Sequence, residues 1–190
     1  MTTTRPIHRI DRHRLIPRGA AACLLALPAV AMWLGVDGVH WTAIDFIVMG
    51  GLLASACAFY ELATRLSDNL AYRLGSGVAG VTALLTVWIN LAVGMLGDEG
   101  NRANRMFLVV LAVAVGASLA AKLRAPGLRW AMLVTALLHL AVAGAAAGMG
   151  FRASDVALTA LFALPWLVAA GLFQRATASA ARPALNGHGR

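Results

Sequence analysis

The sequence predicts an all-α integral membrane protein, a bundle of about six transmembrane helices with both termini in the cytoplasm. Apolar residues make up 60% of the 190 residues and charged residues only 13%, about half the charged fraction of a soluble domain. The apolar residues form long runs, close to the ~20 residues that cross a bilayer. The basic residues lie between these runs, which is how membrane topology is encoded.

The net charge of +8 is a common sign of nucleic-acid binding. Here the positive charges are spread over the two ends and the loops, outside the apolar runs. We therefore expect a lipid bilayer as the partner, and no nucleic acid.

Residues 1–18 are predicted to form a basic cytoplasmic arm, because five arginines face a single acidic residue, Asp11. Each cation near an anionic lipid surface contributes about 1 kcal/mol. The arm acts either as a topology signal alone or as a lipid contact as well.

The predicted transmembrane domain covers residues 19–173 and begins with the run 19–36, which contains Pro28. A basic segment, an apolar run and the small residues Ala29-Val-Ala31 also fit a signal peptide. This run is longer than the usual apolar region of a signal peptide, so we favour a retained first span over a cleaved one.

The second span is expected at 43–65, where Gly50, Ala54 and Ala58 recur every four residues and allow close helix packing. A break is expected at Ala125-Pro-Gly, and Pro165 interrupts the last span. From Gln174 to the end we expect a disordered cytoplasmic tail. The other spans are expected at 77–97, 106–123, 128–148 and 156–173.

The orientation follows from the basic residues. With both termini inside, thirteen of the sixteen Lys and Arg residues fall on the cytoplasmic side and only three on the outer side. This is a strong positive-inside bias over short loops. We expect a multi-pass protein of the bacterial plasma (inner) membrane.

Polar side chains within spans are costly, so they are candidates for function. Asn90 and His139 are predicted at depths of about 20 and 17 Å from the inner edge. Thr82 and Thr86 share the helix face of Asn90, and Thr135 shares that of His139. The two stripes either line a narrow polar path or hydrogen-bond one helix to the other.

Glu61 lies about one turn inside the inner end of its span, with Arg65 four residues later. This order favours an ion pair along the helix. A proton-carrying carboxylate is the alternative.

The hairpin at residues 97–105 is the densest polar segment between the two basic ends. Asp98 and Glu99 follow a helix C-terminus, where the helix dipole disfavours anions. We expect Arg102 and Arg105 to compensate them. Asn101 or Asn104 is expected to cap the next helix.

Two other uses of the hairpin stay open. It could bind a protein partner or a polar ligand. It could also form a cation site for calcium, magnesium or manganese, together with acidic and imidazole side chains of the preceding outer loop, Asp37, His40 and Asp45.

We expect no cofactor. A bis-histidine haem site needs a second buried histidine beside His139, and retinal needs a lysine inside a span, whereas Lys122 is at a helix end. Cys23 and Cys57 lack zinc spacing and are expected to be reduced thiols. The sequence has no Ser/His/Asp or Cys/His order, no P-loop, no GxGxxG and no HExxH motif, so an enzyme is unsupported although not excluded.

The segment Trp88-x-Asn90-x-Ala-Val-Gly-x-x-Gly-x-Glu99-x-Asn101-x-Ala-Asn104 resembles a segment of small bacterial multi-helix membrane proteins that have no assigned activity. The likeness covers fewer than twenty residues. It implies an inner-membrane bundle in which this hairpin matters. The family pattern has proline where this chain has Arg102.

The sequence therefore favours a non-enzymatic accessory component whose outer hairpin binds a membrane or extracytoplasmic protein. A small transporter or channel lined by Asn90 and His139 is the second hypothesis. An embedded enzyme with a metal at the outer face is the third. The small-residue helix faces also allow a homo-oligomer.

Overall fold

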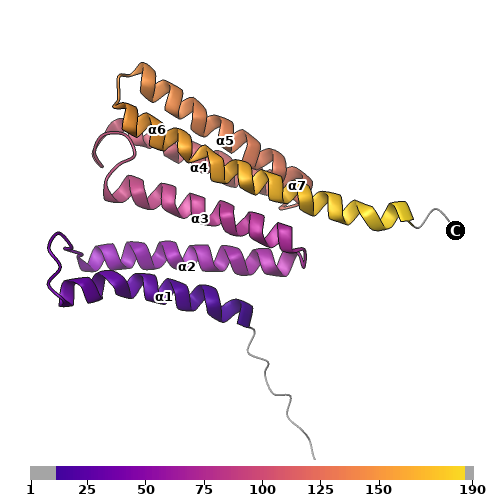
Figure 1. The fold of residues 1–190 in the computed structure, drawn as a ribbon, viewed down its shortest axis with the longest axis horizontal. Helices are drawn as coiled ribbons and strands as arrows, with labels where there is room; N and C mark the ends of the chain where they lie inside the picture. Colours follow the sequence, from indigo (N-terminus) through magenta and orange to yellow (C-terminus); the bar gives the residue numbers. More distant parts are fainter. Residues whose placement is uncertain (1–11, 187–190) are drawn as a thin grey trace, which may run out of the picture. The chain divides into compact units, whose positions relative to one another are not determined.

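The computed structural model describes residues 12–186, and every regular element among them is helical. Figure 1 shows their order along the chain. The elements are α1 (Arg12–Trp33), α2 (Ala43–Leu66), α3 (Leu70–Ala92), the 3-10 helix η1 (Arg102–Arg105), α4 (Met106–Ala120), α5 (Ala125–Gly148), α6 (Ala153–Leu161) and α7 (Ala163–Asn186).

Five helical segments in the described part of the chain are long and apolar enough to cross a membrane. They lie at Ala43–Leu66, Leu70–Ala92, Arg102–Ala120, Ala125–Gly148 and Ala153–Ala181. The apolar part of α1, Pro17–Trp33, is shorter. The predicted all-α class is thus confirmed, and five of the described helices could span a membrane, where about six spans were predicted.

The chain divides into two compact units, one ending at Glu61 and the other beginning at Leu62. The first unit contains α1 and most of α2. Its loop ends in a capping box, because the Asp45 carboxylate accepts hydrogen bonds from the backbone N–H of Thr42 at 2.7 Å and from its hydroxyl at 2.8 Å. Cys23 and Cys57 are both free thiols.

In the second unit α7 packs along both α3 and α5, and α5 also packs against α4 and α6 (Figure 1). Small buried side chains allow these close approaches. Trp166 and Phe173 of α7 fill the centre, and Tyr72 of α3 meets Phe173 edge-on at 5.5 Å between ring centroids. The buried alanines of α5 and α7 include Ala131, Ala136, Ala163, Ala169 and Ala170.

A tight turn joins α4 to α5 where the break was predicted. Lys122 and Leu123 both take positive φ, which ends α4, and a proline in the first turn starts α5. The Tyr72 hydroxyl donates a hydrogen bond to the Leu123 carbonyl at 2.7 Å. A Cβ at Gly127 would lie 2.6 Å from the Ala121 Cβ, so glycine is required there.

The last predicted span is divided as expected, because α6 ends at Leu161 and α7 begins at Ala163, with Pro165 in the first turn of α7. The predicted disordered tail differs from the structure, since α7 continues from Gln174 to Asn186. Alanine-rich sequence favours helix there. In addition, Asn69 Nδ2 donates a hydrogen bond to the Ser179 hydroxyl at 2.6 Å.

Large apolar side chains remain exposed on the spans, for example Leu108, Val115 and Leu119 of α4. A soluble monomer rarely exposes so much contiguous apolar surface. Exposure of this kind fits helices whose outer faces contact hydrocarbon.

Candidate functional site: the hairpin between α3 and α4

The hairpin begins with a glycine that no other residue can replace without strain. Gly94 has φ 76°, and its N–H and that of Val93 both donate to the Ile89 carbonyl at the end of α3. A Cβ on Gly94 would collide with the Asp98 backbone carbonyl and lie 2.8 Å from Asn104 Nδ2. The chain therefore turns back on itself at Gly94.

Asn104 holds the two sides of this turn together. Its Oδ1 accepts a hydrogen bond from the Leu96 N–H at 2.9 Å, and its Nδ2 donates to the Asp98 carbonyl at 2.7 Å. The side chain is largely buried, with 9% of the residue exposed. One amide thus satisfies a backbone donor and a backbone acceptor that lack helical partners.

Asn101 caps η1, as the sequence predicted for one of the two asparagines. Its Oδ1 accepts from the Ala103 N–H at 3.0 Å, and its own N–H donates to the Asp98 carbonyl at 3.2 Å. Asn104 has the different role described above. Arg102 is the first residue of η1, a position where a proline also fits because its N–H is not needed.

The hairpin is anchored to the helices by a hydrophobic cluster. Met95 and Leu96 point inward from the loop and are almost fully buried. They form what we call the hairpin cluster, together with residues of η1, α4 and α5: Ala103, Phe107, Val110, Val142 and Ala146. Burial of two large apolar side chains contributes roughly 1.5–3 kcal/mol each, so the loop is rigidly attached.

A third contact ties the hairpin to α6. The Gly97 N–H donates to Asp155 Oδ2 at 3.3 Å, and the Asp155 backbone carbonyl accepts the Thr159 hydroxyl at 2.8 Å. Asp155 lies in the first turn of α6. Its role depends on a neighbour 58 positions away along the chain, which a local pattern does not reveal.

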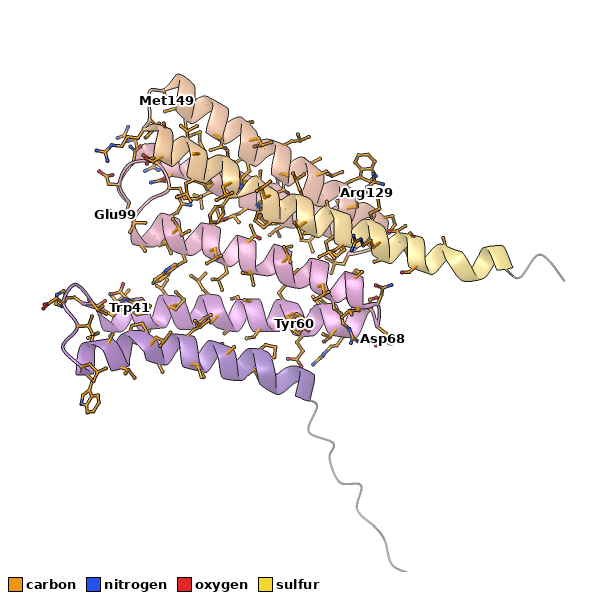
Figure 2. All side chains as sticks on the ribbon, in the orientation of Figure 1. Trp41, Tyr60, Asp68, Glu99, Arg129 and Met149 are labelled. Carbon is orange, nitrogen blue, oxygen red and sulfur yellow. The ribbon has the colours of Figure 1, made fainter. Side chains whose placement is uncertain are left out.

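Asp98 and Glu99 have exposed side chains, as do the hairpin arginines Arg102 and Arg105. Figure 2 shows Glu99 at the bend of the loop between α3 and α4. Within residues 12–186 neither carboxylate forms an ion pair, so the expected compensation by Arg102 and Arg105 is not found. The rigid loop thus presents to solvent two carboxylates that form no ion pair, beside the exposed side chains of Arg102 and Arg105.

His139 of α5 lies at the centre of the second unit and is 0% exposed. Its ring stacks on Phe162 with centroids 6.1 Å apart and is tilted against Phe107 at 5.5 Å. Neither ring nitrogen has a hydrogen-bond partner among the described residues. An unsatisfied buried polar group costs about 1–3 kcal/mol.

Asn90 does not meet His139. Its Nδ2 donates to the Thr86 carbonyl one turn earlier in α3 at 2.7 Å, and its buried Oδ1 has no partner within the described chain. Helix α3 packs mainly on α7, whereas His139 faces residues of α4 and the junction between α6 and α7. The expected hydrogen bond between the two polar stripes is therefore not found.

The threonines of both stripes are satisfied inside their own helices. Thr86 donates to the Thr82 carbonyl at 2.8 Å and Thr135 to the Ala131 carbonyl at 2.8 Å. Such bonds to the residue four positions earlier are common for threonine in helices. Each of these threonine hydroxyls therefore donates its proton to a backbone carbonyl of its own helix.

Glu61 has a long-range partner that the sequence pattern did not indicate. Arg18 Nη2 of α1 lies 2.9 Å from Glu61 Oε2. The predicted pair of Glu61 with Arg65 of the same helix stays a prediction, whereas Arg18 was assigned only to the basic arm. Helix spacing reveals pairs within one helix, but it cannot reveal which residues of α1 face α2.

The candidate cation site gains no support from the geometry. No group of three or more His, Cys, Asp or Glu side chains in the described residues lies close enough together to hold a metal ion. The sequence pattern did not predict the structural roles of Gly94 and of the buried pair Met95 and Leu96. Two large apolar residues between glycines in a polar loop are a signal of inward anchoring.

The chain matches no protein-family model, and no similarity to a curated protein or to a solved structure is found.

Proposed function

We propose that this chain is a non-enzymatic, multi-pass component of the bacterial plasma membrane that binds a partner protein through the α3–α4 hairpin. The observation that carries this proposal is the pair of exposed, unpaired carboxylates, Asp98 and Glu99, on a loop fixed by Asn104 and the hairpin cluster. A rigid loop loses little conformational entropy on binding.

The proposal includes six spans with both termini in the cytoplasm, so that the hairpin is extracytoplasmic. In the second unit, Glu99 and Met149 lie at one end and Arg129 at the other (Figure 2). Lys122 and Arg124 lie in the turn that precedes Arg129, and Arg73 follows Tyr72, whose hydroxyl bonds to Leu123 of the same turn. This arrangement supports the positive-inside orientation.

The partner surface is expected to be basic. Exposed ion pairs contribute only about 0.2–1 kcal/mol each, so two carboxylates cannot by themselves give tight binding. They would steer the approach of a cationic surface and set its orientation. The tight part of the contact must come from additional surface around the hairpin.

A photo-crosslinking residue in place of Gly100 tests the proposal, because a side chain at this exposed position has space. We expect a crosslinked adduct in intact cells that disappears in the isosteric double variant Asp98→Asn/Glu99→Gln. Asp37→Asn, which removes an exposed charge from another loop, is the matched control and should keep the adduct. An adduct that survives the double variant would contradict the proposal.

The second candidate function is a small transporter or channel whose path includes Asn90 and His139. It is favoured by the buried atoms without partners, Asn90 Oδ1 and both ring nitrogens of His139. The enclosure of His139 by Phe107 and Phe162 opposes it. Under this function, His139→Leu would abolish solute flux into proteoliposomes, whereas under the first it would change no flux.

A further inference from the structure

The first unit contains a groove of about 340 Å³ between α1 and α2. Its walls are apolar and include Leu25, Leu53, Gly50, Ala54 and Ala58. The small residues leave space along α2, and one end of the groove is closed by Arg18 and Glu61. The groove is thus apolar along its length and charged at one end.

The length of the groove corresponds to one leaflet of a bilayer. Gly50 and Glu61 line its two ends on α2, and eleven residues at 1.5 Å per residue give about 16 Å. The hydrocarbon core of a bilayer is ~30 Å thick, so this distance is about half of it. An acyl chain of one leaflet would lie along the groove with its headgroup at the charged end.

The charged end presents a cation and an anion side by side. Arg18 Nη2 and Glu61 Oε2 are 2.9 Å apart, and the side chains are 60% and 19% exposed, respectively. The arginine keeps further N–H donors for a phosphate oxygen. A headgroup with a phosphate and an ammonium group matches this pair of charges. A purely anionic headgroup would place its phosphate near the Glu61 carboxylate. It has no ammonium group to offset the resulting repulsion.

We propose that the groove binds an amine-headed, zwitterionic phospholipid, with one acyl chain between α1 and α2, the phosphate at Arg18 and the ammonium group near Glu61. This site is separate from the hairpin and does not depend on its function. A bound lipid would fill the space that the small side chains leave open between helices α1 and α2.

The test is native mass spectrometry of the full chain, purified in mild detergent with equal amounts of phosphatidylethanolamine and phosphatidylglycerol. We expect about tenfold enrichment of bound phosphatidylethanolamine, the ratio given by one charge-assisted hydrogen bond. The double variant Arg18→Gln/Glu61→Gln removes both charges without leaving one unpaired. It should lower the enrichment to about equal binding.

Ala54→Leu fills the groove and should remove most of the bound lipid. The matched control is Ser55→Leu, which adds the same side chain at an exposed neighbouring position outside the groove. Equal lipid retention in the two variants would overturn the proposal. Equal binding of both lipids by the native chain would also overturn the proposal. A third contrary result would be lipid-free dimers that dissociate in Ala54→Leu, because a second copy of the chain would then occupy the groove.

Discussion

At the scale of single residues, Asn104 is the side chain on which the hairpin depends most. Replacing it with alanine would leave the Leu96 N–H without its partner, and the Asp98 carbonyl with the longer bond from the Asn101 N–H alone. Each loss costs about 1–3 kcal/mol where the group is buried. We expect Asn104→Ala to lower the free energy of unfolding by about 2–4 kcal/mol in detergent, whereas Asn104→Asp, which keeps the acceptor, should lose less. Equal stability of Asn104→Ala and the native chain would contradict this role.

Gly94 gives a second prediction at this scale. Gly94→Ala places a methyl group against the Asp98 carbonyl at positive φ and should lower the thermal unfolding temperature by several degrees. Gly116 of α4 has nothing within 4 Å of an added Cβ. Gly116→Ala is the matched control and should stabilise by up to about 1 kcal/mol, the helix preference of alanine over glycine. A similar response of both variants would show that the turn is not fixed at Gly94.

His139 gives a third prediction, because its buried ring nitrogens have no partners. His139→Leu removes this unsatisfied polar group. The stability gained by its removal should exceed the loss of about 0.5–1.5 kcal/mol from the ring contacts to Phe107 and Phe162. We expect an unchanged or higher unfolding temperature. Thr135→Val, which removes a hydroxyl that is satisfied within α5, should not raise it. A marked loss of stability in His139→Leu would mean that the imidazole is held by bonds absent from this account.

The residue scale also shows what sequence could and could not predict. The capping role of Asn101 follows from residue type and position, because capping is local. The partners of Asn104, Asp155 and Glu61 could not be predicted, since each depends on how separate segments meet. Residue type marks a polar group as unusual, whereas only the fold shows which backbone group it satisfies.

At the scale of elements, helix ends depend on both local and distant contacts. The Asn69 side chain accepts from the Tyr72 N–H at 3.2 Å and caps α3, and it also donates to Ser179 of α7. Asn69→Ala should cost about 1 kcal/mol for the cap and more for the second bond. Ser179→Ala removes only the second. Equal stabilities of the two variants in thermal unfolding would contradict the capping role.

The helices were predicted well where apolar runs and breakers determine them, as at Ala125 and Pro165. The extension of α7 to Asn186 was not predicted, because polar and small residues after Gln174 have the composition of a disordered tail. Alanine has the highest helix propensity, and contact with Asn69 adds to it. Composition alone does not distinguish a disordered tail from a helix that continues past the end of its apolar run.

At the scale of the whole chain, the account rests on helices surrounded by lipid, with the hairpin on the outer side. The membrane class follows from composition and from apolar faces that remain exposed in the structure. The proposed orientation is based on the distribution of arginine. If both are right, Glu99 lies outside the cell and Arg175 of α7 inside it.

Cysteine accessibility measures this most directly. In a chain with Cys23 and Cys57 replaced by alanine, single Glu99→Cys and Arg175→Cys variants are treated with a membrane-impermeant maleimide. Both positions are exposed. We expect Glu99→Cys to be labelled in intact cells and Arg175→Cys only after the membrane is permeabilised. Labelling of Arg175→Cys in intact cells, or recovery of the protein from the soluble fraction without detergent, would contradict the account.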